Sequence, residues 1–311
     1  MKQEIFTLIA LAMLATLPLT ACGGGNARDT GDRLQVLATT SIVADVVEQV
    51  GGDYVEVTTL LPLGTDPHTF EPRPQDAAAI ADSTIVFANG AGLEEFLQPL
   101  LESAGATDKF VEVSAGIELL AFEEEHLEGD EEHEHEGGDP HTWMDPNNVI
   151  LWAENIAAAL SAADPEHAAD YQANAEAYIA ALADLDAWIR AEVAQVPAES
   201  RLLVTDHGVF SYFADEYGFT QVGTITGSFS TNASPSAQEL AALEDDIRSF
   251  GVRAVFVGET ANQSLAEQVA ADTGIQIVII YHASLTDDFG LAPSYLEFMR
   301  YNVNAIVNAL K

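Results

Sequence analysis

The sequence predicts an α/β fold of two lobes, each with a mostly parallel sheet flanked by helices. Strand-like and helix-like segments alternate over residues 33–163 and again over 198–311, and this alternation is typical of parallel sheets covered on both faces. Between them, residues 164–197 are alanine-rich, with large apolar residues at helical spacing. We expect one connecting helix there, longer than about 40 Å at the usual rise per residue.

In the first lobe we expect four strands, at residues 34–39, 54–61, 84–88 and 110–113. The helices are expected at 42–50, 75–81, 93–103 and 149–160, and Ser41 has the residue type of a helix N-cap. In the second lobe the strands are expected at 201–205, 219–224, 254–257 and 275–281, and the helices at 209–217, 236–250, 263–273 and 294–310. Ligand sites in such folds lie beyond the carboxyl ends of the strands.

The first 22 residues have the character of a targeting segment. An apolar run over residues 5–19 is too short for a membrane span and ends in Leu19-Thr20-Ala21-Cys22. This ending matches the bacterial lipobox, in which a lipid is attached to the cysteine sulfur; the alternative is an ordinary signal peptide with a chance cysteine. Residues 23–32 have the composition of a flexible tether. We expect an extracytoplasmic protein, at the cell surface or in the periplasm, held to the membrane by a lipid on Cys22.

The charge of the chain excludes some partners. The formal net charge is -39, so nucleic acid is a poor partner, since its phosphates need basic patches. A strongly negative field concentrates cations, although adaptation to a salty habitat explains the global charge equally well. The single cysteine, Cys22, rules out both an intrachain disulfide and a zinc site built from cysteines.

A short motif occurs twice, as Asp66-Pro67-His68-Thr69-Phe70-Glu71-Pro72 and as Asp139-Pro140-His141-Thr142-Trp143-Met144-Asp145-Pro146. Proline fixes its own φ and restricts the residue before it, so each copy predicts a stiff loop that presents one imidazole. A single such turn usually binds nothing. Two copies with the same flanking residues indicate one metal site built from two places.

Two further histidines follow predicted strands in the second lobe, His207 and His282. If the carboxyl ends of both sheets face one cleft, His68, His141 and His207 can converge there, with His282 as a candidate fourth ligand. Zinc binds such nitrogens in a tetrahedron. Several neighbouring carboxylates could accept the second ring N–H and orient the ligands: Asp66, Glu71, Asp139, Asp145 and Asp206.

Residues 123–138 interrupt the α/β pattern with a run of acids, histidines and glycines. Such a composition predicts a loop outside the core. His126, His133 and His135 could capture metal there as an auxiliary loop, and the alternative is a solvated, charged insertion.

From about Leu34 to the C-terminus the chain resembles the solute-binding lipoproteins of zinc and manganese ABC importers, cluster A-I. The resemblance rests on the two histidine motifs, on the acidic histidine loop and on four further segments: Ala38-Thr39-Thr40-Ser41-Ile42-Val43, Asp206-His207-Gly208-Val209-Phe210, Pro235-Ser236 and Ser294-Tyr295-Leu296-Glu297-Phe298-Met299-Arg300-Tyr301-Asn302. It implies two lobes joined by a rigid helix, with the metal in the cleft between them. It also implies delivery of the ion to a membrane permease driven by an ATPase. We expect a monomer that is a carrier and not an enzyme.

The same resemblance implies that His68, His141 and His207 are metal ligands. In manganese-preferring relatives the third position is commonly Glu, so His207 favours Zn²⁺, with Mn²⁺ as the alternative. The fourth ligand of the family is usually an Asp, and Ala283 stands at that position. His282, water or Asp287 could take its place.

Two other functions compete with import. A zinc hydrolase also uses three protein ligands and a water, and Glu71 or Asp206 could serve as its base; however, the sequence contains no HExxH or similar catalytic motif. A surface adhesin or metal buffer would need only the acidic histidine loop.

Overall fold

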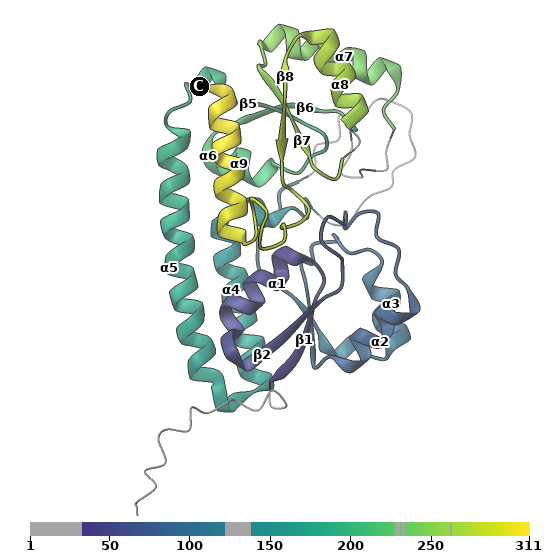
Figure 1. Cartoon of the computed structure of the whole chain (residues 1–311), viewed down its shortest axis with the longest axis vertical. Coiled ribbons are helices and arrows are strands. Elements are labelled where there is room, and N and C mark those ends of the chain that lie inside the picture. The colour runs from purple at the N-terminus through teal and green to yellow at the C-terminus, as the bar shows by residue number, and fades with distance from the viewer. Residues whose placement is uncertain (1–32, 122–137, 228–230, 232–233, 262) are drawn as a thin grey trace, which may run out of the picture. The chain divides into compact units, whose positions relative to one another are not determined.

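The computed structural model describes residues 33–121, 138–227, 231, 234–261 and 263–311. It contains two four-stranded sheets whose neighbouring strands all pair in parallel, with helices packed against them (Figure 1). The predicted α/β fold of two lobes is confirmed. Within the described residues, no helix combines the length and the apolar character that a membrane span requires.

The two sheets have the same strand order. The first runs β2-β1-β3-β4, with β1 at Leu34–Ala38, β2 at Val55–Thr59, β3 at Ile85–Ala88 and β4 at Phe110–Glu112. The second runs β6-β5-β7-β8, with β5 at Leu202–Thr205, β6 at Thr220–Thr224, β7 at Ala254–Gly258 and β8 at Gln276–Ile280. Because all the strands of a sheet point the same way, the loops that follow them gather at one edge of each sheet.

Helices connect the strands. Those of the first lobe are α1 (Ser41–Gly51), α2 (Pro74–Asp82), α3 (Leu97–Ala104) and α4 (Pro146–Ala163). The second lobe contains α6 (Ser211–Tyr217), α7 (Ala237–Phe250), α8 (Gln263–Thr273) and α9 (Tyr295–Leu310). Short 3₁₀ turns lie at Gly52–Tyr54, Thr107–Lys109, Thr142–Met144, Pro165–His167 and Ala198–Ser200.

Several expected helix starts were wrong: α4 begins at Pro146 rather than at residue 149, α6 begins at Ser211 rather than at residue 209, and α1 and α3 also differ. The N-cap of α1 is Thr40, whose hydroxyl accepts from the backbone N–H of Val43, and Ser41 is the first helical residue. Helix α3 begins at Leu97 rather than at residue 93, because Glu94 belongs to the loop before it. The Glu94 carboxylate accepts hydrogen bonds from the backbone N–H groups of Asn89 and Gly90.

The core follows the alternation of side chains along the strands. In the first sheet, Val36 and Ala38 face the cluster that contains α1 and α4, while Leu37 faces the cluster under α2 and α3. In the second sheet, Phe256 lies in the same cluster as α1 and α4, and Val255 packs with α7 and α8. One continuous core therefore joins the two lobes.

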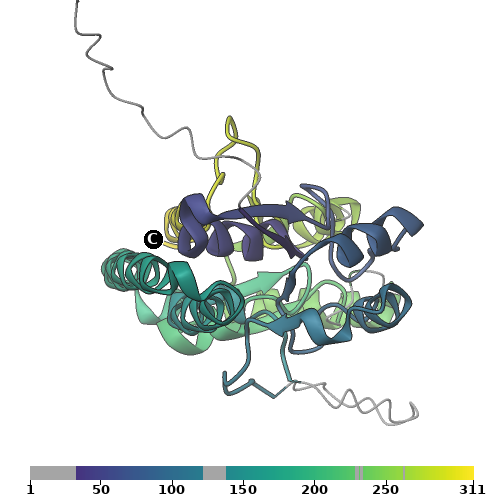
Figure 2. The same ribbon diagram turned by 90° about the horizontal axis from the view of Figure 1, so that it is seen from below.

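The connecting helix is α5, at Ala168–Val193. Its 26 residues span roughly 39 Å, slightly less than expected, because residues 165–167 form a 3₁₀ turn and the helix ends before 196. Both views show α4 and α5 side by side (Figures 1 and 2), and α5 also packs against α1 and α9. The helix thus contacts elements of both lobes.

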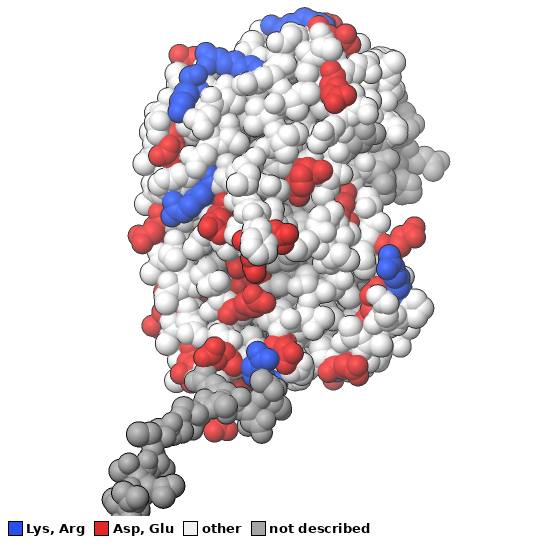
Figure 3. Space-filling model, viewed as in Figure 1, with Lys and Arg blue, Asp and Glu red and all other residues white. Residues whose placement is uncertain are grey.

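Acidic side chains are scattered over the face shown in Figure 3 and outnumber basic ones. They do not gather there into a single patch. This distribution fits a general adaptation of the surface better than a dedicated docking site for one cation.

Candidate metal centre

The two copies of the Asp-Pro-His motif fold into the same local turn. In each copy the backbone N–H of the histidine donates a hydrogen bond to Oδ1 of the aspartate two residues before it. His68 donates to Asp66 at 2.9 Å, and His141 donates to Asp139 at 2.9 Å. Such an Asx turn forms from local sequence alone. It explains why the repeated motif presents each imidazole in the same way.

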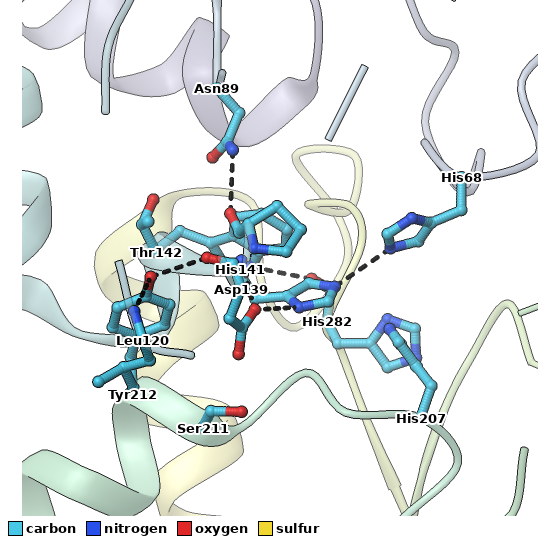
Figure 4. A network of polar contacts seen from close by, with 12 residues as sticks. His68, Asn89, Leu120, Asp139, His141, Thr142, His207, Ser211, Tyr212 and His282 are labelled. Atoms are coloured by element: carbon cyan, nitrogen blue, oxygen red, sulfur yellow. Dashed lines mark hydrogen bonds and ion pairs between the residues drawn. The ribbon is translucent and has the colours of Figure 1, made fainter. Parts of the chain in front are cut away.

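The two loops bring their imidazoles together. Nε2 of His68 lies 3.1 Å from Nε2 of His141 (Figure 4). Two nitrogens bound to one tetrahedral zinc at 2.0–2.1 Å would lie about 3.3 Å apart. His207 joins them from the second lobe, since one ring nitrogen from each of the three histidines lies within 4.8 Å of the others. His141 and His207 are buried, and His68 is half-buried.

Asp139 orients the imidazole of His141. Its Oδ1 lies 2.7 Å from Nδ1 of His141, which leaves Nε2 facing His68 (Figure 4). Burial alone would raise the pKa of Asp139, but the charge and hydrogen bonds of His141 lower it below the ordinary value. An ionised carboxylate behind an imidazole fixes its tautomer and makes it a stronger metal ligand.

Two residues from other elements hold this loop in place. Asn89, directly after β3, donates its side-chain amide to the carbonyl oxygen of Pro140 at 2.9 Å. Tyr212, in α6 of the second lobe, donates its hydroxyl to the carbonyl oxygen of Asp139 at 2.7 Å. Sequence reasoning missed both residues. The Asn-Gly after a predicted strand was a signal for Asn89, whereas nothing local marks Tyr212.

His207 and His282 share one carboxylate. Oδ2 of Asp206 lies 2.9 Å from Nε2 of His282, and Oδ1 lies 3.4 Å from Nδ1 of His207. Asp206, His207 and His282 form a second group of potential ligands, which shares His207 with the first. His282 is thus beside the three-imidazole group rather than within it. Trp143, in the same loop as His141, contacts His282 directly, because its indole N–H donates a hydrogen bond to the carbonyl oxygen of His282.

The protonation states differ among these imidazoles. Burial and the neighbouring imidazoles lower the pKa of His68 to about 2. Burial also lowers the pKa of His207, despite the opposing effect of Asp206. Burial lowers the pKa of His282 too, but Asp206 and Glu259 outweigh it, and the result is a raised pKa. Neutral imidazoles bind metals, so His68 and His207 are ready to do so.

The other site residues predicted from the sequence form no hydrogen bond to the imidazoles of this metal centre in the described part of the chain. Glu71 is exposed and forms no hydrogen bond or ion pair with the described residues, so its role in orienting a ligand stays a prediction. Asp145 is used as the N-cap of α4, where it accepts from the backbone N–H of Asn147. Cys22 and the loop histidines His126, His133 and His135 lie outside the described residues.

The environment of Asp145 predicts an unusual pH dependence of stability. Burial, together with the charges of Glu216 and Asp186, raises the pKa of Asp145 to about 6 despite its bonds to Asn147. Because this pKa exceeds the unfolded value of about 3.9, the ionised group destabilises the fold above pH 6, and stability is regained as the pH falls towards 4. The Asp145→Asn variant keeps a good cap and should be more stable at pH 8 by at most about 2 to 3 kcal/mol.

Thermal unfolding of both proteins at pH 8 and at pH 4 measures this effect. The advantage of the variant should shrink to near zero at pH 4. An equal difference at both values would show that the charge of Asp145 is not responsible.

Two histidine loops from the first lobe and one from the second, converging between parallel sheets, define a metal-binding protein of the two-lobed substrate-binding class. Residues 36–309 match the family described as zinc-uptake complex component A, periplasmic. The chain belongs to this family of substrate-binding components of metal ABC transporters, as the resemblance predicted.

The relatives of this chain are named for the binding of different metals. The manganese-binding lipoprotein MntA of Halalkalibacterium halodurans is 34% identical, over 100% of this chain and 99% of the relative. The iron-binding protein YfeA of Yersinia pestis is 32% identical, over 97% and 94%. The manganese-bound periplasmic metal-binding protein of Candidatus Liberibacter asiaticus superposes with a TM-score of 0.76 at 27% identity, over 90% of this chain and 100% of that one.

Proposed function

We propose that this chain captures Zn²⁺ with His68, His141 and His207 and delivers it to a membrane permease driven by an ATPase. The observation that carries the proposal is the group of three imidazoles, from three different loops, whose nitrogens lie within 4.8 Å of one another. No carboxylate belongs to that group among the described residues. Nitrogen donors suit zinc, whereas carboxylate and water oxygens suit manganese.

His282 is the proposed fourth ligand. Asp206 occupies its Nε2, while its Nδ1 is buried and has no hydrogen-bond partner among the described residues. With the proton of Nε2 directed at Asp206, Nδ1 is the atom that His282 can offer to an ion. Because the pKa of His282 is raised, binding through Nδ1 releases a proton, and the affinity should fall as the pH falls.

Titration calorimetry with zinc and then with manganese tests the choice of ion. The chelator-stripped protein should bind one zinc ion tightly, and manganese at least about tenfold more weakly, in keeping with the nitrogen donors. Replacing His207 by Glu adds an oxygen donor, so the gap between the two ions should narrow. The alternative, Mn²⁺ as the main ion, agrees with the names of several relatives and is supported if manganese binds the unchanged protein more tightly.

The same titration separates import from metal buffering by the acidic loop. Deletion of residues 123–138 should leave the tight zinc site intact, since none of its three ligands lies there. We propose an auxiliary, weaker metal-capturing role for His126, His133 and His135. Loss of tight binding on deletion would instead favour an adhesin or metal buffer built on the loop.

We further propose that the protein is a monomer, anchored outside the cytoplasm through a lipid on Cys22. We also propose that it is a carrier rather than an enzyme. Relatives named as transporter lipoproteins support the anchor and the carrier role. The two bases considered for a hydrolase are poorly suited to that work, because Glu71 is exposed and Asp206 is engaged by His282 and His207. Turnover of an ester by the zinc-loaded protein would contradict the carrier role.

A further inference from the structure

His282 lies directly against the backbone of Gly258, the last residue of β7. A Cβ atom added to Gly258 would lie 1.6 Å from Nε2 of His282 and 2.2 Å from its Cδ2. Contacts this short are impossible, so any larger residue at position 258 would displace the imidazole.

The backbone of Gly258 does not itself require glycine. Its φ is not among the positive values found in the described part of the chain, and alanine is therefore allowed by conformation. Glycine within a strand often marks a place where another group approaches closely. At Gly258 that group is the imidazole of His282.

The recess over Gly258 holds the imidazole in one orientation. Asp206 fixes Nε2 at 2.9 Å, and the ring of His207 stands nearly perpendicular, with centroids 4.7 Å apart. Trp143 holds the backbone of His282 through a bond of 3.0 Å to its carbonyl oxygen. His282 is 1% exposed, so no alternative position in solvent is open to the ring without a local rearrangement.

We propose that Gly258 is a positioning residue for His282, and that the two form a matched pair on which the fourth ligand of the metal site depends. Gly258 provides the space, Asp206 accepts the proton of Nε2, and Nδ1 is left for the ion. The role in metal binding rests on the function proposed above. The positioning of the ring by Gly258 is a separate claim, and it can be tested on its own.

A double-mutant cycle on the full chain tests both claims. The variants are Gly258→Ala, His282→Ala and the combination of the two. Zinc affinity is measured by competition with a chelator, and thermal unfolding is measured with and without zinc. Loss of His282 should weaken zinc binding by about 10- to 100-fold, and Gly258→Ala should cause a similar loss because it expels the ring. The double variant should be no weaker than His282→Ala alone.

Gly223→Ala is the matched control. Gly223 lies in β6 of the same lobe, and a Cβ there would meet Cδ1 of Leu243 at 2.7 Å rather than a ligand. Its effect on unfolding should be the same with His282 or alanine at position 282, and the zinc affinity should not change.

The outcomes separate the two claims. If the unfolding temperatures show coupling between positions 258 and 282 but zinc affinity is unchanged in every variant, Gly258 positions the ring and His282 is not a ligand. If Gly258→Ala does not fold but the double variant does, the positioning claim is also supported. Equal losses from Gly258→Ala in both backgrounds, or failure of the double variant to fold, would overturn it, because glycine would then serve the strand itself.

Discussion

Replacing His141 by alanine is expected to weaken zinc binding by about a thousandfold, which corresponds to roughly 4 kcal/mol. His141 occupies the centre of the site: its Nε2 faces His68, its Nδ1 is held by Asp139, and its ring lies 5.3 Å from that of His207 between centroids. The variant removes one nitrogen donor and the imidazole partner of Asp139, so the buried carboxylate keeps only its other hydrogen bonds, such as that from the backbone N–H of residue 141. Competition with a chelator of known zinc affinity gives the measurement.

His167→Ala is a suitable control for this variant. His167 lies just before α5, where its Nδ1 pairs with Asp164 at 2.7 Å and its ring stacks on Tyr54. It is therefore a structured histidine that belongs to neither group of potential ligands in the described chain. Its loss should change the zinc affinity by less than about twofold, which corresponds to about 0.4 kcal/mol. A similar loss in both variants would mean that His141 acts through general stability.

The second large effect is expected at Trp152. Its side chain is fully buried in α4, within the core that joins the two lobes. Its indole N–H donates to Oγ of Ser114 at 3.0 Å, and that hydroxyl pairs with Oγ1 of Thr142, next to His141. Trp152→Ala should lower the free energy of unfolding by about 3 to 5 kcal/mol through the cavity that it creates.

Trp152→Phe separates packing from hydrogen bonding. It keeps one buried aromatic ring and removes the indole N–H together with part of the ring system, so the expected loss is about 1 to 2 kcal/mol, clearly less than that of alanine. Denaturant unfolding of the three proteins measures both effects. If alanine cost no more than phenylalanine, the core around α4 would not stabilise the fold as we infer.

The sequence was most informative where structure is local. The Asp-Pro-His motifs predicted stiff loops, and both fold as Asx turns whose hydrogen bonds involve only Asp66 with His68 and Asp139 with His141. The strands were predicted within a few residues, because short, nearly continuous apolar runs that alternate with helical segments are typical of buried parallel sheets. The positions of three candidate ligands followed from those strands and loops.

Features that depend on contacts between distant segments were not predictable. Tyr212 is 73 residues from Asp139, whose carbonyl it holds, and the fit of His282 over Gly258 depends on how β7 and β8 pair. For the same reason, the sequence did not show which of the carboxylates beside the histidines orient an imidazole. Asp139 and Asp206 contact imidazoles, whereas Asp145 caps a helix. Spacing in the sequence cannot distinguish these roles, because each depends on tertiary packing.

X-ray absorption at the zinc edge of the protein loaded with one equivalent of zinc tests the central claim most directly. A site built on His68, His141 and His207 predicts at least three imidazole nitrogens at about 2.0–2.1 Å, with the multiple-scattering pattern of the rings. The His141→Ala variant should lose that shell or one imidazole from it. A zinc ion surrounded mainly by oxygen in the unchanged protein would contradict the three-histidine site and would place the bound metal among the acidic residues instead.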